Sequence, residues 1–82
     1  MIRKQNIQIL TEAVLYRLYQ YGVEKGGYIE DEEFLKFSNL GVTSTFLKAS
    51  IDQLNERDQI SRSPFGLDNS EINGKGIKYV QV

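Results

Sequence analysis

The spacing of apolar residues near the N-terminus predicts a long first helix. They recur every three or four residues, at Ile7, Leu10, Val14, Leu18 and Tyr21. This spacing places them on one face of a helix. Thr11 followed by Glu12 offers an alternative cap one turn later, so the start of the helix has two possibilities. Gly22 follows the last periodic residue and Gly26-Gly27 breaks the chain, so we expect the helix to end near Gly22.

A second, shorter helix is predicted after the extended pair Tyr28-Ile29. Four consecutive acids, Glu30 to Glu33, complement the positive end of a helix dipole and predict a helix from about Asp31 to Asn39. Its buried face is expected to contain Phe34, Leu35 and Phe37. The acidic run lacks the alternating Asp/Asn positions and the glycine of a calcium loop, so we expect no metal.

The third predicted helix begins at one of three hydroxyl residues, Thr43, Ser44 or Thr45, each able to accept from an unpaired backbone N–H. It continues to about Arg57. Its core-facing residues are Leu47, Ile51 and Leu54. Asp58 then tolerates the left-handed turn that ends a helix, and the alternation in 59–63 predicts a strand.

The C-terminal segment has two readings. Ile77–Val82 is rich in β-branched and aromatic residues and predicts a closing strand. A rival reading is a fourth helix over Gly74–Val80, capped by Asn73. Two glycines in its first turn would each cost about 1 kcal/mol relative to alanine, so we prefer the strand. The two strands and the loop Pro64–Gly76 then form a β-hairpin.

Composition indicates one soluble domain spanning residues 1–82. The chain has 82 residues, of which 40% are hydrophobic and 26% are charged, and it has no cysteine or histidine. Disulfides, thiolate metal sites and the usual general base are therefore absent, so we expect neither an enzyme nor a cofactor. No apolar run approaches the roughly 20 residues of a membrane helix, and the N-terminus lacks a signal peptide's apolar stretch. We expect a cytoplasmic protein.

Three stretches together carry a family resemblance. They are Thr43-Ser44-Thr45-Phe46-Leu47-Lys48, Leu54-Asn55-Glu56-Arg57-Asp58-Gln59-Ile60 and Gly74-Lys75-Gly76-Ile77-Lys78-Tyr79. A Ser/Thr-started helix that leads into a strand, followed by a Gly- and Lys-rich hairpin, resembles the winged-helix domains of bacterial and phage proteins. With the first two helices, the resemblance covers nearly the whole chain. It implies an α+β fold, a three-helix winged helix-turn-helix with a C-terminal two-stranded β wing.

The resemblance also implies a site for double-stranded DNA. The third helix would be the recognition helix, exposing Ser44, Thr45, Lys48, Ala49 and Asp52. Thr43, beside its possible role as a cap, is also expected to contact DNA. Arg62, Lys75 and Lys78 would contact the DNA backbone or minor groove from the wing. The function implied is that of a transcriptional regulator or a phage or plasmid accessory factor.

The charge of the chain favours an alternative to DNA binding. The formal net charge is −1, whereas DNA-binding domains usually carry excess Lys and Arg, and Asp52 on the reading face repels phosphate. The same fold can instead serve as a protein-interaction module, an adaptor or inhibitor that binds no DNA. A homodimer through the first helix is a further expectation, because Tyr16 and Tyr19, with Met1 and Ile2, exceed what a small core covers.

Overall fold

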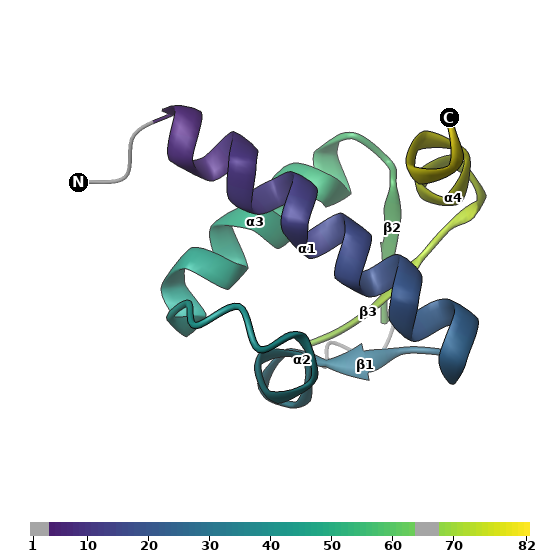
Figure 1. Cartoon of the computed structure of the whole chain (residues 1–82), viewed down its shortest axis with the longest axis horizontal. Helices are drawn as coiled ribbons and strands as arrows, with labels where there is room; N and C mark the ends of the chain where they lie inside the picture. The colour runs from purple at the N-terminus through teal and green to yellow at the C-terminus, as the bar shows by residue number, and fades with distance from the viewer. Residues whose placement is uncertain (1–3, 64–67) are drawn as a thin grey trace.

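Four helices and three short strands make up the computed structural model, which describes residues 4–63 and 68–82 (Figure 1). In chain order they are α1 (Lys4–Glu24), β1 (Ile29–Glu30), α2 (Asp31–Ser38), α3 (Ser44–Glu56), β2 (Ile60–Arg62), β3 (Asn69–Ile72) and α4 (Gly74–Gln81). The expected α+β class is confirmed. The expected count of three helices and two strands is wrong.

The strands form one antiparallel sheet in the order β1-β3-β2. In the middle strand, Ser70 lies opposite Ile29 on one side and opposite Arg62 on the other. The prediction of a loop over Pro64–Gly76 is therefore wrong for residues 69–72, while residues 64–67 lie outside the described residues. A polar strand such as β3 forms because Ser70 and Ile72 alternate toward the core and its backbone pairs with strands on both sides.

A single core lies between α1, α3 and one face of the sheet. Its buried hydrophobic residues are Val14, Leu15, Leu18, Ile29, Phe34, Leu47, Ile51, Leu54, Ile60 and Ile72. The first helix is confirmed, but it continues past Gly22 to Glu24. Thr11 does not start it, because its hydroxyl donates to the carbonyl oxygen of Ile7 at 2.6 Å inside the helix. No helix within residues 4–63 and 68–82 is long and apolar enough to cross a membrane.

The second and third helices begin and end close to the predicted residues. Thr43 is the N-cap of α3, and its hydroxyl oxygen accepts from the backbone N–H of Phe46 at 3.3 Å. Asp58 follows the helix with φ 58°, in the left-handed conformation that Asp tolerates. Phe34 in α2 is buried, while Leu35 and Phe37 pack partly against the core.

The predicted closing strand is wrong, because the chain ends in α4. The Asn73 side chain caps this helix by accepting from the N–H of Gly76 at 2.9 Å. Gly76 is buried, and a Cβ atom there would overlap the carbonyl oxygen of Gln59. The glycine therefore permits a close contact with the segment between α3 and β2, which offsets the propensity cost that favoured a strand.

Candidate functional site

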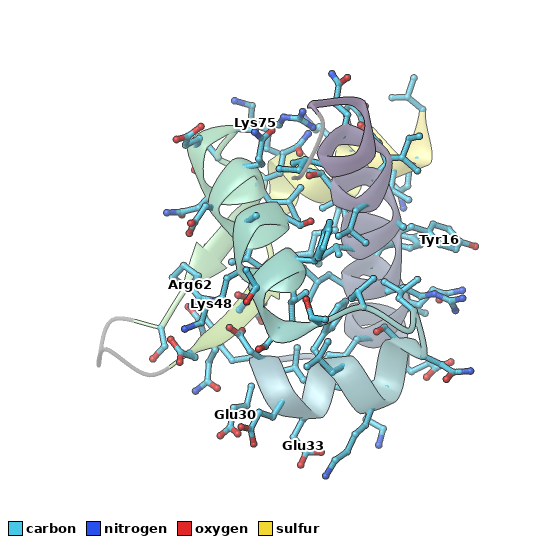
Figure 2. All side chains as sticks on the ribbon, turned by 90° about the vertical axis from the view of Figure 1, so that its left-hand side faces the viewer. Tyr16, Glu30, Glu33, Lys48, Arg62 and Lys75 are labelled. Atoms are coloured by element: carbon cyan, nitrogen blue, oxygen red, sulfur yellow. The ribbon has the colours of Figure 1, made fainter. Side chains whose placement is uncertain are left out.

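The outward face of α3 is polar, as the sequence predicted. Leu47, Ser50, Ile51 and Leu54 point inward and are buried, whereas Ser44, Thr45, Lys48 and Asp52 are exposed and Ala49 is half-buried. In Figure 2, Lys48 lies on the side of the molecule opposite the label of Tyr16 in α1. Lys48 is therefore on the other side of the molecule from Tyr16 and is exposed to solvent.

Lys48 lies beside carboxylates. A cleft of about 170 Å³ at the start of α3 is lined by Asp31, Glu32, Leu35, Ser44, Lys48 and Asp68. Within the described residues Lys48 forms no ion pair or hydrogen bond, although its charge acts on the carboxylate of Asp31. An anionic ligand at Lys48 would consequently approach three acids as well.

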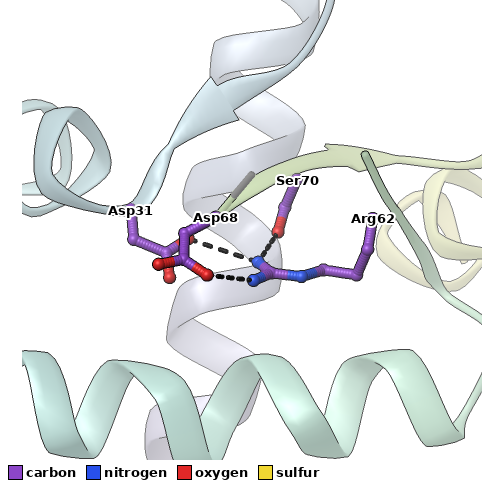
Figure 3. A network of polar contacts seen from close by, with 4 residues as sticks. All are labelled: Asp31, Arg62, Asp68 and Ser70. Atoms are coloured by element: carbon purple, nitrogen blue, oxygen red, sulfur yellow. Dashed lines mark hydrogen bonds and ion pairs between the residues drawn. The ribbon is translucent and has the colours of Figure 1, made fainter. Parts of the chain in front are cut away.

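Arg62, expected to contact DNA from the wing, is engaged within the protein (Figure 3). Its guanidinium lies 3.2 Å from Asp31 Oδ1 and 3.4 Å from Asp68 Oδ1. The same group donates to the hydroxyl oxygen of Ser70 at 2.5 Å. The network joins the start of α2 to β2, β3 and the residue before β3. A phosphate would have to compete with two carboxylates for this guanidinium.

Asp31 is the buried member of this network, with 7% of its surface exposed. Burial raises the pKa of the Asp31 carboxyl group, while the neighbouring Arg62 and Lys48 charges lower it. Its second oxygen, Oδ2, has no hydrogen-bond partner within the described residues. The sequence showed Asp31 only as a helix-start acid, because its partner Arg62 lies 31 residues away.

Lys75 and Lys78 do not lie on a wing. The predicted placement is wrong, since both belong to α4. Figure 2 shows Lys75 near the opposite end of α3 from Lys48 and Arg62. The structure thus brings together Ser44, Lys48 and Arg62, but it does not add Lys75 to them.

The charge of the surrounding segment is negative. Residues 29–56, which span β1, α2 and α3, contain six acids and only two bases, Lys36 and Lys48. Within the described residues, no group of three or more acidic, His or Cys side chains has the arrangement of a metal site. Lys48 is therefore an exposed positive charge in a segment with an excess of acids.

One surface feature could have been recognised more fully from the sequence. Ile9, Tyr16 and Val23 are exposed on α1 and are spaced seven residues apart. This seven-residue spacing is visible in the sequence, but of the three residues only Tyr16 was predicted to lie at an interface. Tyr19, expected beside it, packs partly against the core, and Met1 and Ile2 lie outside the described residues.

Comparison with known proteins does not assign the chain to a family. No protein-family model, curated protein or solved structure matches this chain. The inference of function therefore rests on the residues and their geometry.

Proposed function

We propose that this chain is a winged-helix domain of bacterial or phage type that acts in the cytoplasm by binding alone. The supporting observation is the order α1, β1, α2, α3, β2, β3, together with the placement of β3 between β1 and β2. In such a domain α2 and α3 form the helix-turn-helix, and the β2–β3 hairpin is the wing. The helix α4 is then an addition after the wing.

Duplex DNA is the ligand that this architecture favours. Ser44, Thr45 and Lys48 form the exposed start of α3, where small hydroxyls can approach phosphates and base edges. The backbone N–H groups of Ser44 and Thr45 have no partner within the described residues, because the Thr43 cap accepts from later amides. These groups add a partial positive charge where Lys48 is placed.

Electrostatics limit the affinity of that complex. Each phosphate contact contributes about −0.9 to the slope of log K against log salt, and Lys48 is the central unpaired cation of the α3 face. We therefore expect weak binding with a shallow slope, corresponding to roughly one to three phosphate contacts.

The test is a fluorescence-anisotropy titration of a generic duplex at several salt concentrations. Lys48→Ala should weaken binding and reduce the slope by about 0.9. Lys36→Ala removes the same charge from the end of α2 and is the matched control. Absence of binding at the lowest salt, or equal effects of the two variants, would contradict DNA binding through α3.

A second candidate ligand is a positively charged segment of a partner protein, which the excess of acids over 29–56 favours. Asp52→Asn separates the two candidates, because Asp52 is exposed on the α3 face. Removal of this charge should strengthen binding to a duplex and weaken binding to a short arginine-rich peptide. The peptide reading fails if Asp52→Asn leaves peptide affinity unchanged.

A further inference from the structure

The outer surface of α1 carries a stripe of large apolar side chains. Ile9 and Val23 are each 71% exposed, and Tyr16 between them is 51% exposed. Figure 2 shows Tyr16 pointing away from α3. At about 100° per residue, positions seven apart fall within about 20° of one another on a helix, so the three side chains lie in one row.

The neighbouring helix α4 borders the stripe without covering it. The hydroxyl of Tyr79 donates to Glu12 Oε1 at 2.7 Å, and the Gln81 amide donates to the Tyr19 hydroxyl at 3.3 Å. Tyr79 and Val82 are themselves exposed. Of the six exposed large hydrophobic residues in the described chain, four lie on α1 and α4, and Val82 directly follows α4.

Charges flank the stripe on opposite sides. The helical angle of 100° per residue puts Glu12 on one flank of Tyr16 and Arg17 on the other. Arg17 has no ion-pair partner within the described residues, and its guanidinium donates only to the Gln20 side chain at 3.0 Å. Glu12 has about half of its side chain exposed, although it contacts Arg57 at 3.6 Å.

These charges distinguish between two ways of pairing the helix with itself. In a parallel pair of helices, a residue on one flank meets the residue five positions later on the opposite flank of the other helix. Glu12 of each copy would therefore face Arg17 of the other copy, which gives two such pairs. In an antiparallel pair, each flank meets the same flank of its copy, so the two Arg17 side chains would approach each other. Charge complementarity thus favours the parallel arrangement.

We propose that a second copy of this chain docks on the α1 stripe, with the two α1 helices parallel and with Ile9, Tyr16 and Val23 in the seam. Glu12 of each copy pairs with Arg17 of the other. The proposal does not depend on the ligand of α3. It does give the assembly two α3 faces, which would raise the affinity for a long duplex through simultaneous contacts.

Sedimentation equilibrium over a range of protein concentrations, without DNA, measures the association. Tyr16→Asp should weaken it by about tenfold or more, because a charge would enter an apolar seam. Tyr28→Asp makes the same change at another exposed tyrosine, which lines a cleft with Tyr21 and none of the stripe residues, and should leave the association unchanged. A chain that stays monomeric at all concentrations, or equal effects of the two variants, would overturn the proposal.

A charge exchange tests the parallel arrangement. Glu12→Arg and Arg17→Glu should each weaken self-association, and a mixture of the two variants should form heterodimers more readily than either forms homodimers. Circular dichroism of each variant checks that it folds, since Glu12 also contacts Arg57 and Tyr79. A folded pair that shows no preference for the heterodimer would overturn the parallel pairing. Lys48→Ala should not change any of these results.

Discussion

The helices α1 and α3 pack against each other, but their outer faces are built in opposite ways. Both bury an apolar stripe at three- and four-residue spacing. Outside, α1 presents Ile9, Tyr16 and Val23, whereas α3 presents hydroxyls and charges around Lys48. The inner stripes explain the fold equally well for both helices. The outer residues therefore indicate separate roles for the two helices. Those of α1 suit an apolar partner, and those of α3 suit a polar or charged ligand.

The largest expected effect separates the inner and outer faces of α3. Leu47 is completely buried, so Leu47→Ala should lower the free energy of unfolding by about 3–4 kcal/mol. Lys48→Ala, one residue further on the exposed face, should change it by less than about 0.5 kcal/mol. Urea denaturation measures both variants. A costly Lys48→Ala would mean that the α3 face holds the fold together.

The support that α4 gives to the α1 surface can be broken at Gly76. Gly76→Ala should destabilise the protein by about 2–3 kcal/mol, because its new Cβ atom would overlap the carbonyl oxygen of Gln59. Gly74 lies in the same first turn with no atom near its Cβ position, so Gly74→Ala should stabilise by about 0.5–1 kcal/mol. Thermal or urea unfolding of the two variants measures the contrast. Equal effects would contradict the close packing of α4.

The start of α3 depends on its cap. Thr43→Ala removes the hydroxyl that accepts from Phe46 and should cost about 1 kcal/mol in the free energy of unfolding. Thr45→Ala removes an exposed hydroxyl that caps nothing and serves as the control. If the two substitutions cost the same in urea denaturation, Thr43 does not act as the cap.

The smallest expected effect concerns the acidic side of the α3 face. Because burial raises the pKa of Asp31 above its ordinary 3.8, the folded state holds this proton more tightly than the unfolded chain. The resulting stability is complete below the unfolded pKa and is lost as the pH rises through the folded pKa. As the pH rises from below 3.8 toward neutrality, the wild type should therefore lose stability relative to Asp31→Asn.

Denaturation at several pH values measures this difference, with Asp52→Asn as an exposed carboxylate control. A wild type that gains stability over Asp31→Asn across the same range would show that the Arg62 ion pair outweighs the cost of burial.

Local patterns accounted for the first three helices and for β2. The turn at Asp58 depends on adjacent residues and was predicted from the sequence, whereas the cap of α3 was left open among three hydroxyl residues, of which the structure shows Thr43. The strand β3 was missed because its formation depends on backbone pairing with two distant strands rather than on its own polar residues. For α4, the propensity cost of Gly74 and Gly76 was visible, but the tertiary contact that requires Gly76 was not.

The residues of the candidate site could likewise be predicted only in part. The exposure of Ser44, Thr45, Lys48 and Asp52, which the winged-helix resemblance implied, is confirmed, whereas Ala49 from the same set is half-buried. The pairing of Arg62 with Asp31 and Asp68 could not be predicted, because it depends on the register of the hairpin and on the start of α2. Lys75 and Lys78 were misplaced together with the helix that carries them.

The most direct test of separate roles for α1 and α3 is an NMR titration of the ¹⁵N-labelled protein at low salt with a generic duplex that is too short to contact two α3 faces. We predict that the amide resonances from Ser44 to Asp52 move when the duplex is added at constant protein concentration. The amide resonances of Ile9, Tyr16 and Val23 should not move in the same titration. Shifts centred on the α1 stripe, or no shifts at all, would contradict the assignment of α3 as the DNA-binding face.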